Sequence, residues 1–162
     1  MNVGIYIHIP FCKSRCIYCG FYSTTNKELK ERYVDALIRE IHMRKDDFAR
    51  LGTSLSPSST STVYFGGGTP SSLSVCDIER IVGALESTFN GTPSEVTLEM
   101  NPDDVTKDYM KAVRQMGINR ISMGIQTFDD SRLQFIRRRH NASQAEKAVM
   151  TIREEGIHNV SI

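Results

Sequence analysis

The sequence predicts an α/β fold that forms part of a TIM-like (β/α) barrel. Strand and helix patterns alternate along the chain, and several strands carry one apolar and one polar face. The predicted strands span residues 4–9, 61–66, 95–100, 120–125 and 158–162. The predicted helices span residues 26–50, 75–89, 107–116 and 144–155. Such alternation builds a parallel sheet with helical crossovers.

The two faces of the strands favour a barrel over a doubly wound sheet. In 95–100 the apolar side chains alternate with Thr97 and Glu99, and Asn101 continues the polar set. In 4–9 the isoleucines alternate with Tyr6 and His8. A doubly wound sheet has helices on both faces and near-continuous apolar strands. A polar inner face suits a barrel whose lumen holds a ligand, with the chemistry at the carboxyl ends of the strands.

Capping signals mark the predicted helix ends. They are a Thr25–Glu28 capping box before 26–50, Ser74 before 75–89, Thr106 and Gly117 around 107–116, and Ser143–Glu146 with Gly156 around 144–155. The Ser/Thr-rich segment 51–61 is expected to be a surface connection. Residues 101 and 102, Asn and Pro, are expected to shape the turn after the third strand.

Composition narrows the classes of function. The net charge of +1 gives no reason to expect a nucleic-acid or anionic membrane partner. No apolar run approaches the roughly 20 residues of a membrane-spanning helix, and the first residues do not have the pattern of a signal peptide. We therefore expect a cytoplasmic protein, in which clustered cysteines are metal ligands or redox groups more often than disulfides.

Three of the four cysteines, Cys12, Cys16 and Cys19, stand within eight residues after the first strand. Structural zinc usually needs four protein ligands, and no second cysteine pair is present. A [4Fe–4S] cluster normally has four cysteines, so three would leave one iron open for a further ligand. Cys76 is predicted to be a small apolar residue of the second helix. Zinc remains open as an alternative at this point.

These motifs resemble those of a known family. "CKSRCIYC" is similar to the C-x3-C-x-aromatic-C signature of the radical S-adenosylmethionine enzymes. Together with "VYFGGGTPS", "LEMNPDD" and "RISMGIQTFDD", it resembles the oxygen-independent coproporphyrinogen III oxidase group within them. The resemblance implies a partial radical SAM barrel. Its [4Fe–4S] cluster would bind S-adenosylmethionine, whose reductive cleavage gives methionine and a 5′-deoxyadenosyl radical.

The resemblance also implies roles for residues at the strand ends. Cys12, Cys16 and Cys19 would bind the cluster. Gly67, Gly68 and Thr69 would hold the methionine end of the cofactor, Glu99 its ribose, Gln126 its ribose or carboxylate, and Arg138 its carboxylate. Tyr6 matches a tyrosine that lies over the cofactor's methionine in the family. We assign no catalytic residue beyond this cluster and cofactor site.

Two functions occur in this group, and one position separates them. The decarboxylase of haem synthesis typically has a further cysteine two residues after the third, whereas a haem chaperone has phenylalanine there. Phe21 occupies that position here, although Gly20 is a departure from the chaperone pattern. The resemblance therefore favours a haem chaperone that passes haem to acceptor proteins and lacks the decarboxylase activity. The alternatives are coproporphyrinogen III oxidation and a zinc-stabilised fragment that binds partners.

The resemblance extends over residues 1–162, and family members continue past the fifth strand. We therefore expect residues 1–162 to be the N-terminal portion of a partial barrel, truncated in the fifth strand, with the remaining barrel and a C-terminal domain outside this chain. An exposed sheet edge would then favour self-association.

Overall fold

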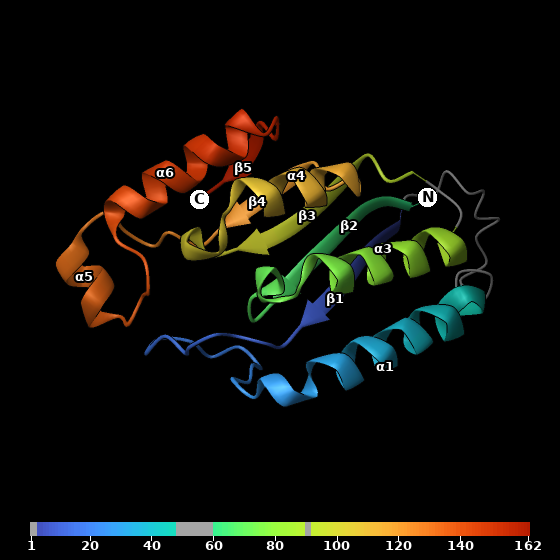
Figure 1. The fold of residues 1–162 in the computed structure, drawn as a ribbon. Coiled ribbons are helices and arrows are strands. Elements are labelled where there is room, and N and C mark those ends of the chain that lie inside the picture. The colour runs from blue at the N-terminus through green and yellow to red at the C-terminus, as the bar shows by residue number, and fades with distance from the viewer. Residues whose placement is uncertain (1–2, 48–59, 90–91) are drawn as a thin grey trace.

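The computed structural model describes residues 3–47, 60–89 and 92–162. Five parallel strands form one sheet in the order β1-β2-β3-β4-β5 (Figure 1). Their bounds are Val3–Ile9, Thr60–Gly67, Glu95–Met100, Arg120–Met123 and Asn159–Ser161. All five predicted strands are confirmed. The fourth ends two residues early, because the chain turns away after Met123.

Four longer helices connect the strands: α1 (Lys30–Met43), α3 (Val75–Phe89), α4 (Lys107–Gln115) and α6 (Ala142–Glu154). They pack in sequence, α1 against α3, α3 against α4 and α4 against α6. Within the described residues β1 pairs only with β2 and β5 only with β4, so the sheet is not closed. The predicted fold, a partial parallel β/α barrel, is confirmed.

Shorter helices lie between these elements: η1 (Lys27–Leu29), η2 (Arg44–Asp46), η4 (Pro70–Ser72), η5 (Pro102–Asp104) and α5 (Asp130–Phe135). Helix α5 is not predicted from the sequence, because it has six residues and buries only Leu133, so it has no apolar stripe. The predicted connection 51–61 and the end of the predicted helix 26–50 lie mostly outside the described residues. No helix of the described segments is long and apolar enough to cross a membrane.

The apolar face of the sheet forms the core. Ile7, Phe65, Leu98 and Ile121 lie in register across β1 to β4, and none is more than 4% exposed. The opposite face carries the register row Tyr6, Tyr64, Thr97 and Arg120. Its first member, Tyr6, is 58% exposed. The predicted division into an apolar helix-facing side and a polar open side is therefore present.

Helix ends depart from the prediction at two places. Asn26, not the Thr25–Glu28 pair, caps the first helical segment by accepting from the Glu28 amide, and α1 itself begins at Lys30. The capping box of α6 is Asn141 with Gln144, two residues before the predicted Ser143 and Glu146. Both pairs have the same spacing, so the sequence pattern could not separate them.

The other caps agree with the sequence. Thr106 accepts from the Tyr109 amide, and Ser74 forms a reciprocal pair with Asp77. Gly117 and Gly156 have φ values of +90° and +85°, the left-handed conformation that glycine adopts without strain after a helix. Cys76 lies in the predicted second helix, in the first turn of α3, and its side chain is exposed rather than packed in the core.

Candidate functional site

A cavity of about 340 Å³ opens at the carboxyl ends of the strands. We call it the strand-end cavity. Nine of the ten predicted site residues line it: Cys12, Cys16, Cys19, Gly67, Gly68, Thr69, Glu99, Gln126 and Arg138. These residues lie at or after the carboxyl ends of four different strands, so the parallel sheet brings them together. Phe21 also lines the cavity.

Tyr6, the tenth predicted residue, lies on the open face of β1 and does not line the cavity. Its ring stacks on Tyr64, with centroids 6.0 Å apart and planes at 21°. Tyr64 in turn donates a hydrogen bond to Glu99 Oε1 at 2.7 Å. Burial and then the Glu99 charge raise the pKa of Tyr6. Its predicted contact with the cofactor stays a prediction.

The cysteine loop leaves β1 and is held by backbone hydrogen bonds. The Thr24 amide donates to Pro10 O at 2.7 Å, and the Cys12 amide donates to Thr24 O at 2.9 Å. A turn follows, in which the Cys19 amide donates to Cys16 O at 3.2 Å. All three cysteines are free, Cys12 buried and the other two half-buried. Pairing at its two ends keeps the loop over the strand-end cavity.

The donor set bears on which centre the cysteines suit. Cys12, Cys16 and Cys19 are the three cysteines that line the strand-end cavity. Structural zinc usually takes four protein ligands, whereas three thiolates on a cubane cluster leave one iron open for a further ligand. A three-cysteine donor set beside a cavity therefore fits the cluster.

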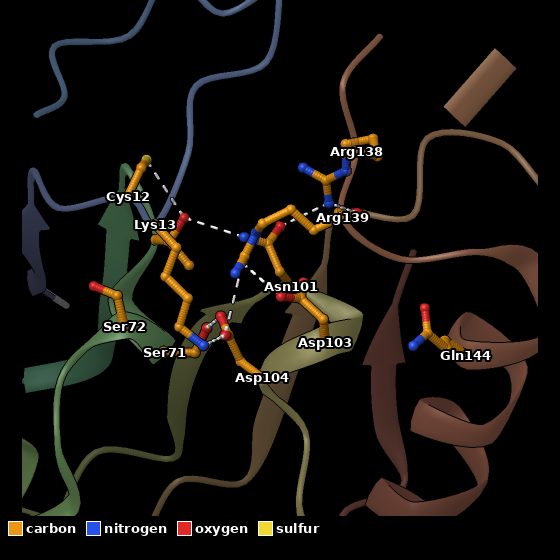
Figure 2. A network of polar contacts seen from close by, with 12 residues as sticks. Cys12, Lys13, Ser71, Ser72, Asn101, Asp103, Asp104, Arg138, Arg139 and Gln144 are labelled. Atoms are coloured by element: carbon orange, nitrogen blue, oxygen red, sulfur yellow. Dashed lines mark hydrogen bonds and ion pairs between the residues drawn. The ribbon is translucent and has the colours of Figure 1, made fainter. Parts of the chain in front are cut away.

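A series of side-chain hydrogen bonds joins two of the cysteines. Figure 2 shows three of its members, Cys12, Asn101 and Arg138. Thr69 Oγ1 donates to Cys12 Sγ at 3.5 Å, and Asn101 Nδ2 donates to Thr69 Oγ1 at 3.2 Å. Arg138 Nη2 donates to Asn101 Oδ1 at 2.6 Å, and Arg138 Nη1 donates to Cys16 Sγ at 3.6 Å. Donors aimed at cysteine sulfur stabilise the thiolate and tune the potential of a bound cluster.

Asn101 is the central member of this series of hydrogen bonds. The sequence itself predicts only a role in the strand-end turn for this residue. Its amide oxygen faces Arg138 and its amide nitrogen faces Thr69. The residue also lines the strand-end cavity. Its position two residues after Glu99, on the same polar face of the strand, was the signal that could have identified it.

Glu99 is fixed by two donors at the end of β3. Besides Tyr64, the Gly67 amide donates to Glu99 Oε2 at 3.2 Å. Gly67 has φ +116°, and a Cβ there would lie 2.8 Å from the His8 ring. A Cβ on Gly68 would lie 3.0 Å from Cys12 Sγ. Both glycines are therefore required by the close approach of this loop to the cysteine loop and β1.

Two residues with side chains adopt the left-handed conformation near the cavity, Gln126 with φ +75° and Arg137 with φ +59°. This conformation costs roughly 1–2 kcal/mol for a residue with a Cβ, and such strain gathers at functional sites. Gln126 itself lines the cavity, and Arg137 directly precedes Arg138. The strain therefore lies where two predicted cofactor residues are placed.

Arg138 retains unused hydrogen-bonding capacity. Its Nη groups contact Asn101, Cys16 and the Gly124 carbonyl, but its buried Nε has no partner among the described residues. A buried donor without a partner is costly and is normally satisfied by a ligand or water. A guanidinium at the cavity wall with a free donor is suited to a carboxylate.

His140 is buried two residues after Arg138. It is 4% exposed, and its Nε2 donates to Ile125 O at 3.2 Å. Burial, followed by the charge of Arg138, lowers the pKa of His140. The imidazole is therefore held neutral beside the Arg138 segment.

Comparisons with known proteins show which proteins this chain resembles. Over 170 aligned residues the chain is 34% identical to the heme chaperone HemW of Synechocystis sp., covering 100% of this chain and 39% of that protein. It is 39% identical over 127 residues to the anaerobilin synthase of Escherichia coli O157:H7, covering 77% of this chain and 27% of that protein. The chain thus spans about two fifths or less of the length of these relatives.

A solved structure gives the same relationship. Coproporphyrinogen III oxidase (HemN) from Escherichia coli, described as a radical SAM enzyme, superimposes with a TM-score of 0.82 at 28% identity. The match covers 98% of this chain and 36% of that one. Residues 6–162 match the sequence profile of the Radical SAM superfamily. The chain therefore belongs to the Radical SAM superfamily.

Proposed function

We propose that Cys12, Cys16 and Cys19 bind a [4Fe–4S] cluster and that the strand-end cavity binds S-adenosylmethionine beside it. Membership of the superfamily implies both cofactors. The observation that carries the residue assignment is the convergence of nine predicted residues from four strand ends on one cavity. The chain would then form the N-terminal part of a longer barrel.

The side chains supply the groups that such a cofactor pair needs. Arg138 offers its unpartnered Nε to the cofactor's carboxylate, and Gly67 and Gly68 let the backbone approach its amino-acid end. Glu99, held by Tyr64 and Gly67, accepts from the ribose hydroxyls. The cluster, when bound by Cys12, Cys16 and Cys19, would supply the electron for reductive cleavage of the sulfonium. Thr69 and Arg138 hold the cysteine sulfurs in place through their hydrogen bonds.

We further propose that the whole protein handles haem as a chaperone. Several relatives that match nearly the whole chain, at 34% identity, are named heme chaperone HemW. Phe21 supports the same assignment, because it lines the cavity where the decarboxylase has a further cysteine. Haem and haem-accepting proteins are then the expected partners.

Coproporphyrinogen III oxidation is the second candidate. The structural match to HemN favours it, since that enzyme shares the fold of 98% of this chain. The absence of a cysteine at position 21 argues against it.

Metal analysis of anaerobically reconstituted protein tests the cluster assignment. We expect iron and acid-labile sulfide in equal amounts, both lost in the Cys16→Ser variant and retained in Cys76→Ser. Zinc without labile sulfide would contradict the proposal and favour a zinc-stabilised binding fragment.

The choice between haem delivery and haem synthesis needs the longer protein that contains this chain. We expect it to bind haem in an absorbance titration and to transfer it to an acceptor apoprotein. Anaerobic incubation with coproporphyrinogen III, S-adenosylmethionine and a reductant should release no carbon dioxide. Release of carbon dioxide with formation of protoporphyrinogen would overturn the chaperone assignment.

A further inference from the structure

A second layer of polar residues lies next to the strand-end cavity (Figure 2). The Asp104 carboxylate, whose side chain is 2% exposed, accepts from Lys13 Nζ and from Ser71 Oγ, the latter at 2.7 Å. Arg139 Nη2 lies 3.7 Å from Asp104 Oδ1 and 2.7 Å from Asp103 Oδ2. We call Lys13, Ser71, Asp104 and Arg139 the supporting layer.

The supporting layer connects the same chain segments as the hydrogen bonds at the strand-end cavity. Its members are sequence neighbours of the residues that join the two cysteines: Lys13 follows Cys12, Ser71 is two residues after Thr69, Asp104 three after Asn101, and Arg139 follows Arg138. The same four segments therefore contact one another at two places. The first set of contacts involves the predicted cluster and cofactor residues, and the second set is centred on the Asp104 carboxylate.

The contacts around Asp104 balance charge. Lys13 and Arg139 bring two positive charges, and Asp103 and Asp104 bring two negative charges. A buried ion pair is weak evidence for stability, but removing one partner leaves an uncompensated buried charge and is strongly destabilising. Among the charged side chains Lys13, Asp103, Asp104 and Arg139, Asp104 is the most buried, at 2% exposure. Asp103, Arg139 and Lys13 are 16%, 29% and 39% exposed, and Asp104 contacts both cations. It is the member on which the arrangement depends most.

We propose that Asp104 is a positioning residue of the strand-end cavity. Through Lys13 it holds the cysteine loop, and through Arg139 it holds the segment that carries Arg138. The distance between the cluster ligands and the cofactor arginine is thereby set before either cofactor binds. Asp104 itself contacts no predicted cofactor residue and acts only through its neighbours. Preorganisation of this kind reduces the ordering cost of binding.

This inference deepens the proposed cluster and cofactor site and rests on it, but it can be tested without any cofactor. We would measure amide hydrogen exchange of the cluster-free chain for wild type and Asp104→Asn, an isosteric change that removes the charge. The control is Asp35→Asn, which breaks the Arg80–Asp35 ion pair of 2.5 Å between α1 and α3.

We expect exchange of the amides in 11–24 and 137–140 to rise about tenfold in Asp104→Asn, while the amides of α3 stay as in wild type. A tenfold rise corresponds to about 1.4 kcal/mol of local opening free energy. The control should leave both segments unchanged. A uniform rise over the whole sheet, or no rise in the two segments, would overturn the proposal.

Three further variants separate the contact through Lys13 from the contact through Arg139. Lys13→Met should loosen 11–24 alone, and Arg139→Met should loosen 137–140 alone, whereas Lys13→Arg should restore wild-type exchange. If Lys13→Met loosens neither segment, the positioning role is refuted. If the exchange effects appear but the chain takes up no iron and sulfide, the positioning role stands and the proposed function fails.

Discussion

The helix-facing side of this sheet differs in chemistry from its carboxyl rim, the edge where the strands end around the strand-end cavity. On the helix-facing side, Ile7, Phe65, Leu98 and Ile121 form a continuous row that packs in the core. At the carboxyl rim, polar side chains are joined by hydrogen bonds, the backbone is strained at Gln126, and the Arg138 Nε has no partner. Apolar packing stabilises the fold, whereas the carboxyl rim retains a hydrogen-bond donor, Arg138 Nε, that is available to a ligand. Stability and cofactor binding should therefore respond to different mutations.

The largest effect on stability is expected on the core side. Leu98→Ala removes a side chain with 0% exposure from the middle of the apolar row. Large-to-small changes of this kind cost about 2–5 kcal/mol. Urea unfolding should show this loss, and Leu29→Ala, at a leucine that is 43% exposed, should show much less. Equal losses in the two variants would contradict the assignment of Leu98 to the core.

Gly68→Ala should disturb the rim more than the core. The added methyl would meet Cys12 Sγ and two backbone atoms at 3.0 Å, and overpacking costs about 1–3 kcal/mol. We expect reduced iron and sulfide uptake on reconstitution, because Cys12 must move.

Gly83→Ala is the matched change, because no atom lies within 4 Å of a Cβ at that position in α3. Alanine is favoured over glycine in a helix by about 1 kcal/mol, so this variant should be more stable and take up iron as wild type does. Normal iron uptake by Gly68→Ala would show that the approach to Cys12 is not needed.

Asn101→Ala should weaken cofactor binding with a smaller effect on the fold. It removes the link between Arg138 and Thr69. We expect the affinity for S-adenosylmethionine, measured by anaerobic calorimetry on the reconstituted chain, to fall about tenfold, or about 1.4 kcal/mol. Asn119, which bridges the Val96 amide and Ser94 O at the opposite end of the strands, provides the control. If Asn119→Ala reduces the affinity as much, the effect is not specific to the rim.

The smallest effect is expected from His140. Its pKa is lowered in the folded state, so folding favours the neutral imidazole. The resulting stability is fully present above the unfolded pKa of about 6.5 and is lost as the pH falls from there toward the lowered value. The groups that face it are Arg138, Arg139 and Asp103. Urea unfolding at pH 7.5 and 5.5 should show a smaller pH dependence in His140→Gln than in wild type. An unchanged pH dependence would exclude this role.

The contrast between core and rim also explains what the sequence could predict. The strands and longer helices follow from periodicity, because burial of one face leaves a repeating signal, as in Leu98 and its register partners. The cavity residues followed from the family motifs and from their positions at strand ends. Asn101 was missed as a bridging residue, since its two partners are 32 and 37 residues away along the chain. The contact of Asp104 with Lys13 spans 91 residues and carries no local pattern.

Cys12, Cys16 and Cys19 are proposed to hold a [4Fe–4S] cluster that binds S-adenosylmethionine beside Arg138 and Glu99. Electron paramagnetic resonance of the reconstituted, reduced chain is the sharpest test of this proposal. We expect a [4Fe–4S] signal whose g values shift when S-adenosylmethionine is added, and no such shift in Arg138→Met. An identical cluster signal with and without S-adenosylmethionine would refute the proposal.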